Sequence, residues 1–111
     1  MGLDQYVFER ADQPDQDDIE VWYWRKHANL EAWMETLFQS KGGEGEFNCK
    51  EVELTPQDID KLEQQYTNLD QASGFFWGAS DLEDMAATAA FITKARKLHS
   101  KGRSIYYTSW W

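Results

Sequence analysis

The feature that most constrains the fold is the succession of strand-like and helix-like segments along a short chain. Residues 3–9 alternate and are rich in β-favouring types, 20–26 are aromatic and bounded by polar residues, and 104–110 form a last strand-like segment. Between these segments, apolar residues recur at the 3.6-residue period of a helix. Because 111 residues have room for one hydrophobic core, we expect a single domain, 1–111, that combines a sheet with helices.

Three segments are predicted to be helices. The first begins at Asn29, whose side-chain oxygen can accept a hydrogen bond from an unpaired backbone N–H, and it ends before the glycines of 42–45. The second begins with Thr55 as N-cap and Pro56 in the first turn. The third begins at the capping-box pattern of 80–83. The apolar stripes are Leu30, Trp33, Met34, Leu37 and Phe38; Ile59, Leu62, Tyr66 and Leu69; and Met85, Ala86, Ala89, Ile92 and Leu98.

Five segments are predicted to be strands: 3–9, 20–26 (where helix is the competing prediction), 47–54, a short one within 73–78, and 104–110. The order ββαβαβαβ indicates an α+β fold of two layers, with about five strands in one mostly antiparallel or mixed sheet and three helices. Cys49 is expected to be a small buried hydrophobe on the third strand. Trp110 is expected to pack inward from a last strand that lies inside the sheet.

The net charge of −9 is concentrated in the first half of the chain. Residues 1–60 carry 15 acids and 5 bases, whereas 61–111 carry 5 acids and 6 bases. Such a charge repels phosphate backbones, so direct nucleic-acid binding is not expected. This charge favours a partner with a basic surface, or it serves solubility alone. The segment 12–18, which carries several carboxylates, is expected to form a solvated loop.

Several classes of protein and site are disfavoured. No apolar run is long enough for a membrane span, no leader is expected, and a single cysteine fits a reducing cytoplasm. The soft and imidazole ligands, Cys49, His27 and His99, are far apart and match no metal spacing, and the acids of 12–18 lack the EF-hand pattern. We expect no metal and no cofactor. No nucleophile–base pattern is present, although an active site assembled from distant residues stays open.

The binding candidates centre on Tyr23, Trp24, Arg25 and Lys26, where flat rings alternate with cations. In a strand, Trp24 and Lys26 share one face, and Tyr23 and Arg25 the other. Either face can stack a ring or hold a carboxylate or phosphate. The competing interpretation places Trp24 in the core and the cations in water. Trp77 belongs to a second aromatic patch, directly before the third helix.

Five blocks of residues follow one another along the chain: Met1-Gly2-Leu3-Asp4-x-Tyr6, Tyr23-Trp24-Arg25-Lys26-His27-x-Asn29-Leu30-x-x-Trp33-Met34, Phe47-Asn48-Cys49 with Val52-Glu53-Leu54, Ser73-Gly74-Phe75-Phe76-Trp77-Gly78, and Tyr106-Tyr107-x-Ser109-Trp110. In these blocks the chain resembles a family of small, functionally uncharacterised proteins encoded by tailed bacteriophages and prophages. Trp77 departs mildly from that pattern, because a third phenylalanine is expected there. The label phosphoglycerate kinase, sometimes given to such proteins, does not suit a chain too short for two lobes.

The resemblance implies a protein made in the cytoplasm of an infected bacterium, with Asp4, Arg25, Lys26, Asn29 and Ser109 as candidates for a functional surface. The leading hypothesis is a non-enzymatic phage accessory protein that binds a host or defence protein with a basic surface, one variant being mimicry of DNA charge. The alternative is a binder of a small nucleotide-like anion at the Tyr23–Lys26 block. Both a monomer and a homodimer stay open.

Overall fold

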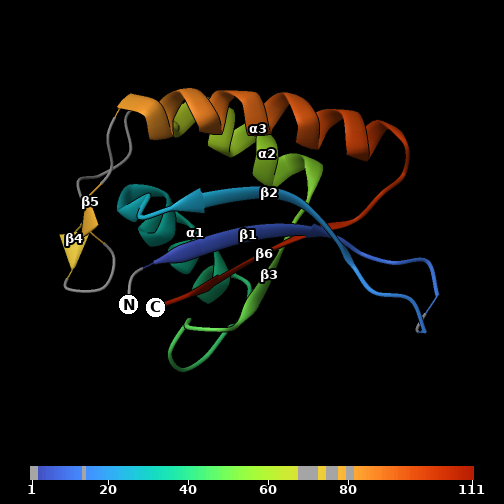
Figure 1. Cartoon of the computed structure of the whole chain (residues 1–111), viewed down its shortest axis with the longest axis horizontal. Helices are drawn as coiled ribbons and strands as arrows, with labels where there is room; N and C mark the ends of the chain where they lie inside the picture. The colour runs from blue at the N-terminus through green and yellow to red at the C-terminus, as the bar shows by residue number, and fades with distance from the viewer. Residues whose placement is uncertain (1–2, 14, 68–72, 75–77, 80–81) are drawn as a thin grey trace.

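A computed structural model describes residues 3–13, 15–67, 73–74, 78–79 and 82–111 (Figure 1). Three helices lie against a twisted sheet, and a small hairpin stands at one end. The elements in chain order are β1 (Asp4–Glu9), β2 (Ile19–Arg25), α1 (Ala28–Ser40), β3 (Glu51–Leu54), α2 (Pro56–Gln65), β4 (Ser73–Gly74), β5 (Gly78–Ala79), α3 (Leu82–Ser100) and β6 (Ile105–Trp110).

The main sheet has four antiparallel strands in the order β2-β1-β6-β3. The predicted α+β class is confirmed, and so is the position of the last strand, because β6 lies between β1 and β3. The expected single sheet of about five strands is not found among the described residues. Ser73–Gly74 and Gly78–Ala79 instead pair with each other in a separate two-stranded sheet. Residues 75–77 of that predicted strand, and the capping residues 80 and 81, lie outside the described part.

The core fills the space between one sheet face and the helices. Inward side chains of the strands, among them Val7, Trp24 and Tyr107, meet Phe91 and other helix residues in one buried cluster. Aromatic rings pack on one another within it: Trp24 lies edge-to-face on Phe91 with centroids 5.0 Å apart. No helix in the described ranges combines the length and apolarity that a membrane crossing requires.

The second helix begins as predicted. The Thr55 hydroxyl accepts from the Asp58 backbone N–H, and the Asp58 carboxylate accepts from the Thr55 N–H at 2.8 Å, which completes a capping box with Pro56 behind it. The Lys41 amine, at the end of α1, also donates to Asp58. Burial alone would raise the pKa of Asp58, but these hydrogen bonds outweigh it and lower that pKa.

The first helix begins at Ala28, one residue before Asn29, so Asn29 is not its N-cap. His27 occupies the cap position and makes no capping hydrogen bond with its side chain. The Gln5 amide fixes this start, accepting from the His27 N–H at 2.8 Å and donating to the His27 carbonyl at 3.1 Å. Lys26, in a left-handed conformation with φ 59°, turns the chain from β2 into α1.

Two expectations about buried side chains are wrong. Cys49 is exposed and lies in a turn with φ 64°, so the third strand begins only at Glu51. Trp110 is 54% exposed. The period of two along β6 explains the second error: Tyr107 and Ser109 face the core, so Trp110 must face away from it.

Candidate functional site

The predicted binding block is divided between the two faces of the sheet. Trp24 lies in the core with 3% exposure, whereas Tyr23 and Arg25 point to the opposite face, which none of the described helices covers. Lys26 is exposed in the turn after β2. Arg25 and Lys26 form no ion pair with any described residue. The block therefore does not converge on one pocket.

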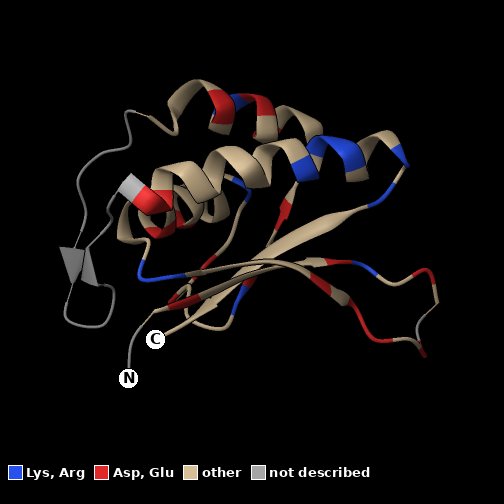
Figure 2. Cartoon of the chain, turned by 45° about the horizontal axis from the view of Figure 1, so that its top comes forward, with Lys and Arg blue, Asp and Glu red and all other residues tan. Residues whose placement is uncertain are grey.

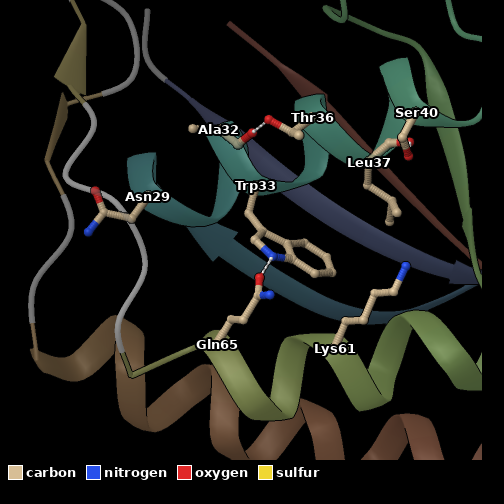
Figure 3. A pocket seen from close by; sticks show the side chains of 8 residues that line it. All are labelled: Asn29, Ala32, Trp33, Thr36, Leu37, Ser40, Lys61 and Gln65. Atoms are coloured by element: carbon tan, nitrogen blue, oxygen red, sulfur yellow. Dashed lines mark hydrogen bonds between the residues drawn. The ribbon is translucent and has the colours of Figure 1, made fainter.

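The other candidates lie in separate places. Asp4, on β1, accepts a hydrogen bond from the Tyr23 hydroxyl at 2.6 Å, so these two residues do lie together. Asn29, on α1, lines a cleft between α1 and α2 (Figure 3). Trp77 lies outside the described residues. Ser109 is fully buried and donates to Glu31, so it offers no surface.

The uncovered face of the sheet carries a cluster of aromatic rings, which we call the open face. Tyr6 is central: its ring centroid lies 5.2 Å from that of Tyr23, 5.5 Å from that of Trp110 and 5.9 Å from that of Phe8. Tyr106 extends the cluster along β6, because its cross-strand partner is Phe8. Tyr23 is 44% exposed and Trp110 54% exposed, so the rings are accessible from solvent.

Hydrogen bonding and charge hold these rings in place. The bond to Asp4, together with partial burial, raises the pKa of Tyr23 to about 12, so its hydroxyl stays protonated. The Arg10 guanidinium lies over the Tyr106 ring at 4.0 Å from the centroid and pairs with Glu51 at 2.6 Å. This intramolecular cation–π contact shows how a guanidinium is accommodated on the open face.

Carboxylates outnumber cations around the open face. Glu20 is the cross-strand partner of Phe8 and Glu53 that of Tyr106, so both share the face of the rings. Both are exposed, and neither forms an ion pair within the described ranges. Figure 2 shows acids along the β1–β2 connection and β3, whereas the bases gather at the C-terminal end of α3. The rim comprises the acids Asp4, Glu20, Glu51 and Glu53 and the bases Arg10 and Arg25.

Sequence reasoning did not single out the open face. The strands that carry its rings, β1, β2 and β6, have aromatic residues in succession or alternation, such as Tyr106 beside Tyr107, and the sequence does not say which of them face outward. The pairing of β1 with β6 is the observation that would have revealed the open face. Once these two strands pair, one face must carry all four of the rings Tyr6, Phe8, Tyr106 and Trp110.

A second polar cluster, also missed, is buried between α1 and the sheet. The Glu31 carboxylate accepts from the Tyr107 hydroxyl and, at 2.8 Å, from that of Ser109, and Gln5 donates to the Tyr107 oxygen at 2.8 Å. Burial raises the pKa of Glu31 to about 7, although both hydroxyl bonds oppose the shift. All four residues are completely buried, so this cluster supports the fold and is closed to a substrate. The sequence feature that could have indicated this cluster is the position of Glu31. This acid is four residues after His27 and three before Met34, so it lies on the same side of the helix as the apolar stripe.

Among the described residues, no three His, Cys, Asp or Glu side chains lie close enough together to hold a metal ion. Comparison with known proteins finds no family model, no curated protein and no solved structure that matches the chain. What the protein does has therefore to be inferred from the chemistry of its own surfaces.

Proposed function

We propose that this chain is a non-enzymatic binding protein that docks a basic surface of a partner protein on its open face. The observation that carries the proposal is a cluster of accessible rings with two rim carboxylates, Glu20 and Glu53, that form no ion pair with any described residue. Tyr and Trp are the side chains that most often dominate protein–protein binding energy, and exposed clusters of them mark interaction sites. Arginine suits both parts of this surface, because it stacks on rings and pairs with carboxylates.

The charge of the rim favours a protein partner over a nucleic acid. Aromatic rings on an open sheet also stack nucleic-acid bases, but such platforms need cations to attract the phosphates. Here the rim has four acids against two bases, and Arg10 is already engaged by Glu51 and Asp18. A phosphate backbone would be repelled, whereas a basic protein surface would be attracted.

The same charge argues against a second copy of this chain as the partner. Two copies joined by their open faces would bring Glu20 and Glu53 of each rim close to the acids of the other, in chains that already carry −9 each. Like charges placed together across an interface cost several kcal/mol. A partner of the opposite charge avoids this repulsion.

The resemblance to phage and prophage proteins would make that partner a host or defence protein in the bacterial cytoplasm. The alternative function, binding of a nucleotide-like anion at the Tyr23–Lys26 block, loses support from the geometry. Trp24 is in the core, and the exposed side chain of Arg25 forms no hydrogen bond or ion pair with any described residue.

A calorimetric titration tests the proposal with three soluble peptides of equal length, rich in arginine, lysine or glutamate. We expect saturable binding of the arginine peptide, weaker binding of the lysine peptide and none of the glutamate peptide. Trp110→Ala should weaken arginine-peptide binding about tenfold, as removal of a central aromatic contact does. Increasing salt should weaken it further by screening the rim.

Matched charge variants separate the open face from the overall charge. Glu20→Gln with Glu53→Gln removes two carboxylates at the rim, whereas Glu35→Gln with Glu83→Gln removes two from the helix layer. We expect the first pair alone to weaken binding of the arginine peptide. Equal weakening by both pairs would mean that only net charge attracts the peptide, and the proposed function would be abandoned.

A further inference from the structure

The lining of the cleft between α1 and α2 differs in charge from the chain as a whole. It encloses about 360 Å³ and is lined by Asn29, Ala32, Trp33, Thr36, Leu37, Ser40, Lys61 and Gln65 (Figure 3). Its lining includes one base and no acid, in a chain whose net charge is −9. The cleft is in the helix layer, whereas the open face is on the opposite side of the sheet, so the two sites can be tested separately.

Lys61 is the charged group of the cleft, and its side-chain amine forms no hydrogen bond or ion pair with any described residue. Two acids of the same helix, Asp60 and Glu63, are close in sequence but pair with Arg96 of α3 at 2.8 and 3.2 Å. Asp58, one turn earlier, is occupied by Lys41. The Lys61 side chain therefore extends toward α1 with its charge unneutralised (Figure 3).

Gln65 supplies a second donor one turn along α2. Its Oε1 accepts from the Trp33 indole N–H at 2.7 Å, which orients the amide and leaves the Nε2 hydrogens without a partner among the described residues. Because Lys61 and Gln65 are four residues apart, they lie on the same face of the helix. Both residues offer hydrogen-bond donors to the cleft, an ammonium and an amide N–H₂, and such donors suit a carboxylate or phosphate.

Trp33 supplies an apolar surface of fixed orientation. Its hydrogen bond to Gln65 holds the indole across the space between the helices (Figure 3). Indole faces stack flat rings. On the same wall, the hydroxyls of Thr36 and Ser40 donate to helix carbonyls of Ala32 and Leu37, so their oxygens can still accept. A volume of 360 Å³ suits a small molecule and not a peptide or a duplex.

We propose that the α1–α2 cleft binds a small molecule made of a flat ring and one anionic group, with the ring against Trp33 and the anion on Lys61 and Gln65. The two sources of the anion, phosphate and carboxylate, share this chemistry. Adenosine monophosphate represents the first and indole-3-acetate the second, and adenosine and indole-3-acetamide are their uncharged counterparts.

The test is a titration of the ¹⁵N-labelled chain with each of the four probes, following the indole N–H signal of Trp33, which is assigned by its loss in Trp33→Phe. We expect saturable shifts of this signal with an anionic probe and affinity about tenfold lower for its uncharged counterpart. Lys61→Gln should abolish that difference. Lys101→Gln, the same charge change on an exposed residue outside the cleft, should preserve it.

Gln65→Glu serves as a second variant, since it places a carboxylate in the cleft one helical turn from Lys61 and should prevent binding of either anionic probe. Trp110→Ala, on the open face, should leave the titration unchanged. Absence of saturation by all four probes at about 5 mM, where even weak sites of millimolar Kd fill, would overturn the proposal. Equal affinity for charged and uncharged probes would overturn it as well.

Discussion

At the scale of single residues, the most consequential group is Glu31, a carboxyl buried with Tyr107, Ser109 and Gln5. Replacing a buried ionised group by a neutral one of the same shape removes a cost of desolvation and keeps the hydrogen bonds. Glutamine fits here, because its oxygen can accept from Tyr107 while its nitrogen donates to Ser109.

The stability of the protein should therefore depend on pH through Glu31. Its pKa is raised from 4.5 to about 7 in the folded state, so the folded state binds the proton more tightly. The resulting stabilisation is complete below pH 4.5 and is lost as the pH rises through 7, by about 3 kcal/mol. We expect Glu31→Gln to be more stable than the parent above pH 7 and to lack this decline. Urea unfolding at several pH values measures both, and a decline of equal size in the variant would contradict the assignment.

A second residue-scale prediction concerns Cys49, whose φ of 64° disfavours any side chain with a Cβ. Cys49→Gly relieves that strain and should raise the free energy of unfolding by about 0.5–1 kcal/mol, after the greater flexibility of unfolded glycine is subtracted. Cys49→Ala is the control, because it removes the exposed thiol and keeps the Cβ. Thermal unfolding of both variants decides: the same midpoint for glycine and alanine would show that the backbone is not strained there.

At the scale of elements, the N-terminal cap of α2 is formed by residues within one helical turn, so a single substitution there should remove it. Thr55→Ala removes the acceptor for the Asp58 N–H and a hydroxyl donor to the Asp58 carboxylate. We expect a loss of about 1 kcal/mol of unfolding free energy, and Thr55→Ser, which keeps the hydroxyl, should recover most of it. Denaturant titration of the three proteins measures the difference. A serine variant as unstable as alanine would show that the threonine methyl, and not the cap, matters.

The elements also show which features sequence patterns can predict. The start of α2 was predictable, because Thr55, Pro56 and Asp58 act within one turn. The start of α1 was not, because the Gln5 side chain, 22 residues away from His27, holds the cap in place of Asn29. The third strand is shorter than predicted because the chain turns at Cys49, and no glycine at that position indicates the turn in the sequence. Where contacts between residues far apart in the sequence determine the start or end of an element, a local sequence pattern cannot predict that position.

The candidate functional surfaces show the same difference between features set by local sequence and features set by distant contacts. Alternation along β2 correctly separates Trp24 from Tyr23 and Arg25, and this separation is what divides the predicted binding block. The open face depends on the pairing of strands about 100 residues apart, since β1 pairs with β6 at Gln5 and Ser109. The α1–α2 cleft depends on packing of two helices joined by Trp33 and Gln65. Neither surface is encoded in a contiguous motif.

At the scale of the whole molecule, a net charge of −9 and an acidic rim should keep the chain monomeric. Light scattering at low salt should give a mass near 13.0 kDa, the mass of one chain. Dimers that Trp110→Ala dissociates would place a second copy on the open face, against the proposed function. Dimers insensitive to Trp110→Ala would refute only the prediction of a monomer.

The most direct test of the central claim maps where the arginine peptide binds. Chemical-shift changes in the ¹⁵N-labelled chain, recorded during the titration, report the residues that the peptide contacts. We predict the largest changes at Tyr6, Phe8, Tyr23, Tyr106 and Trp110, with α1, α2 and α3 little affected. Changes confined to the helices, or to the acidic β1–β2 connection alone, would contradict the claim that the open face is the binding surface.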